Sequence, residues 1–315
     1  NRVVIIIAMK EEAGPFIQQY HLEEQIPSPF APMPMVCYRG LVHGMEVCLV
    51  WTGRDERYKV NNVATTAASV ACYAAVVHYR PDLVLSAGTA GGFAAVGGRV
   101  GDVYLSTKCV FHSRRIPAGR NYEEYGFGHF RSPPLPKLAA KLALKQGVVS
   151  TSDCLDFASV DMEMMRSEGT AVKEMEAAAV AWVSQQLNVP FLALKSVTDI
   201  VDGPETVGDE FYANLAAASQ ALQVSLGDLL ASLKGTTLQS WSDGHYNSSA
   251  FSNSSNSSST RTETGAVHMA SVKEPPSRTA MKHNSPSYWP KPLISLVVAG
   301  VATTTAWVLA SAART

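Results

Sequence analysis

An excess of positive charge is missing from this sequence, as are paired cysteines and histidines at metal-ligand spacing. Charged residues make up only 17% of the chain and the net charge is −1, so an electrostatic nucleic-acid binder is not expected. The five cysteines form no Cys-x-x-Cys pair and lie mostly in apolar stretches. We therefore expect reduced core cysteines, with neither a zinc site nor a disulfide framework. The eight histidines likewise indicate no metal site.

Strand-like runs and helical patterns alternate from the start of the chain to residue 235. Residues 3–9 form a continuous apolar run, which is typical of a central strand buried on both faces. Further strands are expected at 36–40, 46–52, 82–87, 103–112, 147–151 and 191–197, and helices at 10–20, 60–79, 177–187 and 210–233. This alternation predicts an α/β sandwich with a mostly parallel or mixed sheet.

The composition changes after residue 235, where the α/β pattern stops. Residues 236–291 are rich in serine and asparagine, and we expect a disordered linker because such a segment cannot bury enough apolar area. Residues 292–313 carry no charge over 22 positions, which is long enough for a C-terminal membrane anchor. Three threonines at 303–305 weaken its hydropathy, so an incidental apolar tail stays open as the alternative. The folded domain over 1–235 is expected in the cytoplasm, either free or tail-anchored to a membrane facing the cytosol.

Two acidic residues stand 23 positions apart beside apolar, strand-like runs. Glu176 lies within the run 172–180, and Asp199 ends the run 191–199. Burying a carboxylate is costly unless it is paired or used, and the carboxyl ends of strands are where α/β sheets bind ligands. Taken singly, Asp199 could instead cap a helix, and Glu176 could be a surface acid on a helix. Together they are candidate site residues.

A glycine-rich segment, 86–93, follows the strand expected at 82–87. Its sequence is Ser-Ala-Gly-Thr-Ala-Gly-Gly-Phe, and we expect a turn in which the glycines let a ligand approach the backbone closely. The segment does not match the Gly-x-Gly-x-x-Gly pattern, and no Gly-Lys-Ser/Thr follows it. Neither a dinucleotide site nor an ATP site is therefore expected.

Four motifs, in this order, carry a resemblance to a known family. They are Ala8–Glu12, Ala87–Phe93, Glu174–Glu176 and Val197–Asp199. Residues 3–234 closely resemble the methylthioadenosine/S-adenosylhomocysteine nucleosidases of the nucleoside phosphorylase superfamily. The plant-type enzymes share further residues with this chain, at 110–112, 114–117, 155–156 and 201–203.

The resemblance implies a fold and an activity. The fold would be a three-layer sandwich, with a central mixed sheet flanked by helices. The activity would be hydrolysis of the N-glycosidic bond of 5′-methylthioadenosine to adenine and 5-methylthioribose in methionine salvage, by a homodimer without metal or organic cofactor. A loop from the partner subunit would cover the 5′ end of the substrate, and the aromatic stretch 122–130 is the candidate for it. Whether S-adenosylhomocysteine is also a substrate is left open.

Such a reaction needs carboxyl groups in three places. The purine leaves more easily when its N7 is protonated, and Asp199 matches the family's acid for this step. Water captures the cationic sugar, and Glu12 matches the carboxylate that deprotonates it, although spacing alone does not separate Glu12 from Glu11. Glu176 matches the acceptor of the ribose 2′- and 3′-hydroxyls, whose hydrogen bonds stabilise the developing positive charge.

The resemblance implies further substrate contacts. Met175 would pack under the sugar as an apolar floor, while Leu155 and Val197 would contact adenine largely through backbone groups. The glycine-rich segment would contribute Gly88, Thr89, Ala90 and Gly91. Lys195 stands where the family frequently has an arginine, and we expect it to form an ion pair.

Three alternatives stay open at this point. Arg54, in the segment 53–55, could bind phosphate as in the phosphorylases, so a purine nucleoside or methylthioadenosine phosphorylase is the first. A non-catalytic nucleoside-binding or storage homologue is the second, although the presence of Glu12, Glu176 and Asp199 together argues against it. A membrane scaffold that carries a nucleoside-sensing domain is the third.

Overall fold

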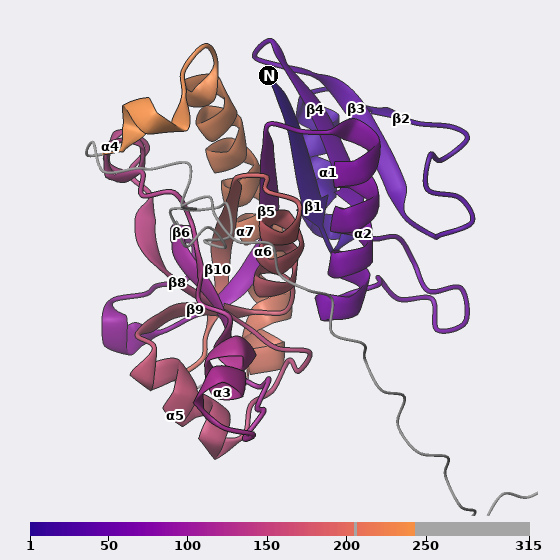
Figure 1. Ribbon diagram of the computed structural model, residues 1–315. Coiled ribbons are helices and arrows are strands. Elements are labelled where there is room, and N and C mark those ends of the chain that lie inside the picture. Colours follow the sequence, from indigo (N-terminus) through magenta and orange to yellow (C-terminus); the bar gives the residue numbers. More distant parts are fainter. Residues whose placement is uncertain (205–206, 243–315) are drawn as a thin grey trace, which may run out of the picture. The chain divides into compact units, whose positions relative to one another are not determined.

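The computed structural model describes residues 1–204 and 207–242, and strands alternate with helices through most of them. The strands are β1 (Arg2–Ile7), β2 (Glu23–Glu24), β3 (Val36–Val42), β4 (Met45–Trp51), β5 (Leu83–Gly92), β6 (Val103–Phe111), β7 (Phe130–Arg131), β8 (Lys145–Thr151), β9 (Thr170–Glu174) and β10 (Phe191–Ile200). The helices are α1 (Lys10–Gln19), α2 (Ala64–Tyr79), α3 (Arg120–Phe127), α4 (Pro136–Lys141), α5 (Ser159–Ser167), α6 (Ala177–Gln186) and α7 (Val207–Leu233), with short 3-10 helices η1 (Ala94–Val96) and η2 (Leu238–Trp241). Together they form a mixed α/β fold with a central sheet flanked by helices, as predicted (Figure 1).

One mixed sheet contains all of these strands. Its order is β10-β6-β8-β9-β5-β1-β4-β3-β2, with β7 beside β6. Because β10 also pairs with β5, the strands β10, β6, β8, β9 and β5 close into a ring. β1 runs parallel to β4 and β5, and β10 runs parallel to β5. The carboxyl ends of β1, β5 and β10 therefore lie at one edge of the sheet, where α/β folds bind ligands.

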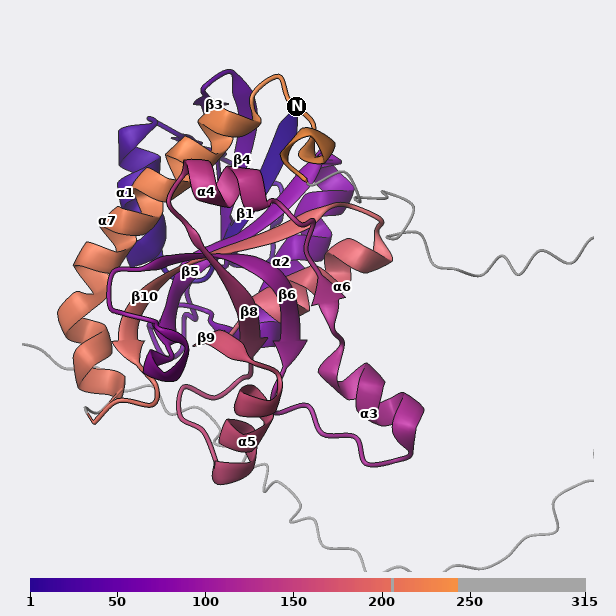
Figure 2. The same cartoon turned by 90° about the vertical axis from the view of Figure 1, so that its left-hand side faces the viewer.

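The strand β1 shows why both faces of the sheet are covered. Val4 and Ile6 pack into a cluster with side chains of α2 and α6, whereas Val3, Ile5 and Ile7 pack into a second cluster with side chains of α1 and α7. Successive side chains of a strand point to opposite faces, so an unbroken apolar run must be buried on both sides. Figure 2 shows these two pairs of helices on opposite sides of the sheet. The predicted two-sided central strand is confirmed.

The glycine-rich segment 86–93 is not a turn, contrary to the prediction. β5 continues through it to Gly92. β10 pairs with β5 from Phe191 to Ile200, and Gly91 and Gly92 also pair with β9. Neighbouring strands thus bind the backbone of this segment, and their pairing overrides the weak preference of glycine for strands.

The part of the chain between β6 and β9 contains three helices that periodicity does not predict. Helices α3, α4 and α5 have only 8, 6 and 9 residues, too few for a clear helical period. The aromatic stretch 122–130, which was expected to be a loop, accordingly lies mostly in α3. α2 begins at Ala64 rather than at residue 60, and Asn61 before it forms a bridge with Arg54.

The first residues after α7 are ordered. Residues 236–242, which the composition assigns to the linker, include η2, and the ring of Trp241 lies 5.2 Å from the Lys141 ammonium group of α4. The rest of the predicted linker and the predicted anchor 292–313 lie outside the described residues. Within the parts that the structure describes, no helix has both the length and the hydropathy of a membrane span.

Candidate active site

A cavity of about 1180 Å³ opens at the edge of the sheet where β1, β5 and β10 end. It is lined by the start of α1, the loop before α2, the ends of β5 and β10, the connection from β9 to α6, and the first turns of α7. The three predicted acids, Glu12, Glu176 and Asp199, all line it. Folding thus gathers carboxyl groups that lie far apart in the sequence.

Glu12 lies in the first turn of α1 and faces β5. Its Oε1 accepts hydrogen bonds from Thr89 N (2.7 Å) and Thr89 Oγ1 (2.6 Å), and its Oε2 accepts one from Met9 N (3.2 Å). Gly88 permits this approach, because a Cβ atom there would lie only 3.2 Å from Oε1. Burial raises the pKa of Glu12, and the hydrogen bonds from Thr89 oppose that rise. Such a fixed carboxylate can accept a proton from a bound water.

Glu11 has a different environment, although it is adjacent in sequence. Its side chain is exposed and accepts a hydrogen bond from Asn61 Nδ2 (2.9 Å) on the loop before α2. Glu12, by contrast, is only 5% exposed. Both acids line the cavity, but only Glu12 is buried there.

Asp199 lies near the carboxyl end of β10 and is 3% exposed. Its Oδ1 accepts a hydrogen bond from Thr198 Oγ1 (2.7 Å). Gly91 lies opposite on β5, where a Cβ atom would come within 2.7 Å of Asp199 Oδ2, so only glycine leaves room. Burial raises the pKa of Asp199, the Thr198 hydroxyl opposes the rise, and Glu210 adds to it. Its place within β10 excludes the helix-cap alternative, and a carboxyl group with a raised pKa can act as a general acid.

Glu176 stands one residue before α6 and is partly exposed to the cavity. Its Oε1 accepts a hydrogen bond from Ala64 N (2.8 Å) at the start of α2. Loss of hydration raises the pKa of Glu176 to about 7, Glu174 adds to the rise, and Lys195 opposes it. Glu176 is therefore a cavity residue rather than a surface acid on a helix.

Glu174 is a further acid of this segment, which sequence reasoning did not assign to the site. Its Oε2 lies 2.8 Å from Lys195 Nζ, and both side chains are 1% exposed, which confirms the predicted ion pair of Lys195. Glu174 also accepts hydrogen bonds from Glu176 N (3.0 Å) and Ala177 N (2.9 Å) at the start of α6. Within the run 172–180, β9 therefore ends at Glu174 and α6 begins at Ala177, where the predicted helix 177–187 begins.

The other predicted contacts fall into two groups. The residues that line the cavity are Leu155, Met175, Thr89, Ala90 and Gly91. Gly88 is not among the lining residues and instead lies against the Glu12 carboxylate. Val197 lies elsewhere: its side chain is buried in the core, its N–H donates to Asp102 O, and its C=O accepts from Gly101 N, both at 2.9 Å. The register of β10 against β5 shifts between Val197 and Asp199. These contacts leave the backbone of Val197 engaged away from the cavity, so the structure does not support its predicted role with adenine.

The cavity also contains side chains that sequence reasoning did not name. Phe211 and Tyr212 enter it from the first turns of α7, and Phe157 enters it from the loop before α5. Lys173, immediately before the motif 174–176, lines it as well. Lys173 could have been found from its position beside a recognised motif. The aromatic residues belong to no motif, so the sequence held no signal for them.

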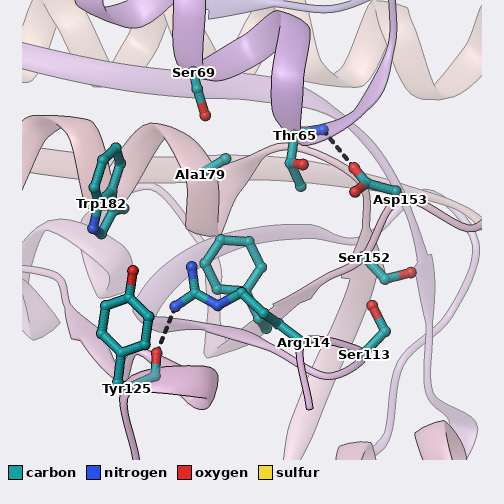
Figure 3. Close-up of a pocket in the computed structure, with 10 residues that line it drawn as sticks. Thr65, Ser69, Ser113, Arg114, Tyr125, Ser152, Asp153, Ala179 and Trp182 are labelled. Atoms are coloured by element: carbon teal, nitrogen blue, oxygen red, sulfur yellow. Dashed lines mark hydrogen bonds between the residues drawn. The ribbon is translucent and has the colours of Figure 1, made fainter. Parts of the chain in front are cut away.

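A second cavity, of about 460 Å³, lies between α2, α3 and α6. Arg114 donates hydrogen bonds to Gly126 O (3.0 Å) and Tyr125 O (2.5 Å), and its guanidinium group lies 4.0 Å from the centre of the Phe111 ring. Figure 3 shows Arg114 beside Tyr125, with Thr65 and Asp153 joined by a hydrogen bond at another wall of the cavity. This cavity contains none of the three acids of the larger one.

His112 and Arg115, which are close to Arg114 in the sequence, are engaged in local contacts. His112 is 2% exposed, with its Nδ1 2.9 Å from Ser150 Oγ, and Arg115 forms an ion pair with Asp161. Among residues 1–204 and 207–242, no group of three or more His, Cys, Asp or Glu side chains surrounds a common metal position.

Comparison with known proteins gives three findings. A family model described as the phosphorylase superfamily matches residues 2–231. The 5′-methylthioadenosine/S-adenosylhomocysteine nucleosidase of Arabidopsis thaliana is 38% identical over 239 residues, which cover 76% of this chain and 94% of that protein. The structure of the Arabidopsis thaliana 5′-methylthioadenosine nucleosidase in its apo form is similar with a TM-score of 0.74 at 36% identity, and the match covers 76% of this chain and 98% of that one.

Proposed function

The chain belongs to the phosphorylase superfamily, and from that membership we propose a nucleosidase that hydrolyses 5′-methylthioadenosine to adenine and 5-methylthioribose. It is an N-glycosidic hydrolase with a small nucleoside as substrate. The observation that carries this proposal is the convergence of Glu12, Glu176 and Asp199 on one cavity. Each of the three acids has a different set of partners, which suits three different tasks.

Asp199 supplies the proton for the leaving purine. Burial raises its pKa, so its carboxyl group stays protonated at a higher pH than an exposed aspartic acid does. When the C1′–N9 bond breaks, the electron pair goes to the purine, and the proton from Asp199 goes to N7. The cost of separating an anion from the cationic sugar is thereby lowered.

Glu12 activates the water that captures the sugar cation. Its Oε1 is held by two hydrogen bonds from Thr89, which leaves the carboxylate in a fixed orientation. The water oxygen bonds to C1′, and one proton of the water passes to Glu12. The carboxylate must be ionised to accept this proton. In its ionised form, the raised pKa of Glu12 makes it a stronger base.

Glu176 and Met175 hold the ribose. The Glu176 carboxylate accepts hydrogen bonds from the 2′- and 3′-hydroxyl groups, and these strengthen as positive charge develops on the sugar. Met175, in the connection from β9 to α6, lies under the ring as an apolar contact. Leu155 and the end of β5, Thr89–Gly91, stay the proposed contacts of the base.

The test uses the purified full-length chain with 5′-methylthioadenosine, in buffer with and without inorganic phosphate. Release of adenine with 5-methylthioribose, at a rate independent of phosphate, is the expected result. A sugar 1-phosphate formed only with phosphate would replace the hydrolase by a phosphorylase that uses Arg54, which also lines the cavity. No turnover of any nucleoside, despite binding, would instead support a non-catalytic homologue.

A homodimer through the outer face of α2 is part of the proposal. Val70, Tyr73 and Val77 are 38%, 58% and 52% exposed and share one side of this helix. Trp182 of α6, which borders the second cavity beside α2, is 36% exposed. Exposed apolar side chains along one side of a helix favour burial against a second copy. The stretch 122–130 stays the candidate segment that reaches the partner's substrate.

Sedimentation velocity tests the dimer. Tyr73→Glu should shift the protein from dimer to monomer, because a charge buried in an apolar interface is strongly unfavourable. Val224→Glu, at an exposed apolar position of α7 on the opposite side of the sheet, makes the same change of charge away from this face. An unchanged sedimentation coefficient for Tyr73→Glu would exclude this face as the interface.

The segment 292–313 is proposed as a tail anchor on its sequence alone, with the catalytic domain facing the cytosol. Its three threonines make insertion into a membrane less favourable. A fluorescent protein fused to residues 280–315 should appear on membranes after fractionation, and a diffuse cytosolic signal would exclude the anchor.

A further inference from the structure

Lys173 is a cationic side chain of the cavity to which the reaction above assigns no task. It lies on β9, is only 6% exposed, and lines the cavity together with Asp199 and Leu155. A buried ammonium group is costly unless partners compensate it. Its partners therefore indicate what it does.

The strand register places Lys173 and Asp199 on either side of one glycine. Gly91 of β5 pairs with Lys173 of β9 and with Asp199 of β10. Residues directly opposite each other in a sheet project their side chains to the same face. Lys173 and Asp199 therefore project to one face of the sheet, and Gly91, which lies between them, has no side chain. A Cβ atom at Gly91 would come within 2.7 Å of Asp199 Oδ2. Glycine thus leaves room for the Asp199 carboxyl group.

The ammonium group of Lys173 also holds a loop. Its Nζ donates hydrogen bonds to Cys154 O (3.0 Å) and Leu155 O (2.7 Å). These two bonds use two of the three N–H donors of the group and fix its position. The loop they hold carries Leu155, the proposed contact of the base.

We propose that Lys173 is a positioning residue of the reaction, which fixes the Cys154–Leu155 loop and places a positive charge beside Asp199. This inference rests on the proposed nucleosidase activity for its role in turnover. When the C1′–N9 bond breaks, its electron pair goes to the purine and Asp199 gives its proton to N7. Lys173 keeps its own proton throughout and stabilises the Asp199 carboxylate that this transfer leaves.

Charged groups from several elements surround the pair. Asp199 interacts with Lys173 of β9 and with Glu210 of α7, whose Oε2 accepts a hydrogen bond from Ile200 N (2.9 Å). Burial raises the pKa of Asp199 and Glu210 adds to the rise, while the Thr198 hydroxyl and Lys173 oppose it. Without Lys173, the carboxylate of Asp199 loses its main cationic neighbour and its pKa should rise further.

The pKa of Lys173 is lowered on balance, because burial outweighs the charges of the neighbouring acids. Burial lowers the pKa of Lys173, and the charges of Asp199, Glu174, Asp156 and Cys154 oppose that fall. His112 also interacts electrostatically with Lys173. Burial is the main cause that lowers the pKa of His112 to about 4, and the charge of Lys173 adds to this fall. His112 is therefore neutral over the pH range of the test and does not compete with Lys173 as a source of charge.

Three substitutions separate charge from hydrogen bonding. Lys173→Gln keeps a donor without the charge, Lys173→Arg keeps both, and Lys173→Met keeps neither. Activity falls at high pH where Asp199 loses its proton, so removal of the charge should move this fall to higher pH in the Gln and Met variants. A nearby opposite charge shifts a pKa by about one unit or more, so we expect a displacement of about one pH unit with a lower plateau. Lys108→Gln, at a lysine paired with Glu168 away from the cavity, is the control.

The pKa of Asp199 can also be followed without turnover. In protein labelled with ¹³C-aspartate, the carboxyl signal absent from Asp199→Asn identifies Asp199, and its titration midpoint is measured in each variant. A rise in the Gln and Met variants, with no rise in the Arg and Lys108→Gln variants, supports the proposal. Equal midpoints in all folded variants overturn it, even if the KM of Lys173→Met rises, because Lys173 would then only anchor the loop.

The two proposals can fail separately. If the parent protein releases no adenine but the midpoint moves as expected, the nucleosidase fails and the charge coupling stands. If adenine is released and the midpoints are equal, the activity stands and this inference fails. Circular dichroism checks the fold of each variant, and if Lys173→Met unfolds, Lys173→Gln decides the outcome because it keeps a donor for the loop.

Discussion

Glu174 and Glu176 are two residues apart and both line the cavity, but their surroundings differ. The Glu174 side chain is 1% exposed and its Oε2 lies 2.8 Å from Lys195 Nζ. Glu176 is partly exposed, and its Oε1 accepts a hydrogen bond from Ala64 N. Burial acts to raise the pKa of both groups. At Glu174 the charge of Lys195 and several hydrogen bonds outweigh burial, so its pKa is lowered, while the pKa of Glu176 is raised to about 7.

The difference teaches how to distinguish a structural acid from a chemical one. Glu174 has an ammonium partner and also binds the first N–H groups of α6, so its charge is compensated within the protein. Glu12, Glu176 and Asp199 all have raised pKa values and all line the cavity. A buried acid with incomplete compensation is available to a substrate, and a fully compensated one stabilises the fold.

The strongest test of the structural side of this comparison is Lys195→Met. It leaves Glu174 as an unpaired buried charge, so the free energy of unfolding should fall by about 3–5 kcal/mol. Lys195→Arg, which keeps the charge, should lose much less. Both are measured by denaturant unfolding monitored by circular dichroism. A loss below about 1 kcal/mol for Lys195→Met would show that Glu174 does not depend on its partner.

The strongest test of the chemical side is Asp199→Asn. An amide cannot protonate N7, so turnover of 5′-methylthioadenosine should fall by about 10²-fold or more while the fold is retained. Glu163→Gln, at an exposed position of α5, makes the same acid-to-amide change and should leave activity intact. Near-normal adenine release by Asp199→Asn would remove this residue from the mechanism.

A pair of neighbouring substitutions sharpens the comparison within α1. Glu12→Gln should lose hydrolysis by about 10²-fold, because an amide cannot accept the proton of the water, while still binding substrate analogues. Glu11→Gln, whose side chain is exposed, should stay active. Calorimetric binding and initial rates measure the two effects. If Glu11→Gln is the inactive variant, the base has been assigned to the wrong carboxylate.

The smallest expected effect concerns Glu176 and pH. The free protein needs ionised Glu176, so kcat/KM should fall as pH decreases through about 7. Glu176→Gln should lose about tenfold, since charged hydrogen bonds to the diol become neutral ones, and the fall near pH 7 should disappear from its profile. A 2′-deoxy substrate should also lose less in this variant than in the parent. Equal losses in both proteins would place Glu176 away from that hydroxyl.

Part of the site could be predicted because its residues stand within recognisable local segments. Glu12 follows the first strand, Glu176 belongs to the motif 174–176, and Asp199 ends an apolar run. The choice between Glu11 and Glu12 could not be made from spacing, because adjacent residues of a helix differ only in the neighbour they face. That neighbour is Thr89, which is distant in sequence.

Other features depend on pairing between distant strands, and local patterns do not contain them. The segment 86–93 resembles a turn by composition, yet it is a strand because β10 and β9 pair with it. Val197 belongs to the same motif as Asp199, yet a register shift between them leaves Val197 in the core. The sequence predicted an ion pair for Lys195, but it did not indicate that Glu174 is the partner.

The sequence by itself determined the alternation of strands and helices, the two-sided burial of β1 and the segments that carry the candidate acids. These are local properties, because hydrophobic period and residue type are carried by short segments of chain. Only the tertiary structure decided which acid meets Lys195, which meets Thr89, and which faces Lys173 across Gly91. Those outcomes depend on strand register and long-range packing, and the resulting contacts determine whether a buried carboxyl group is compensated or left available for catalysis.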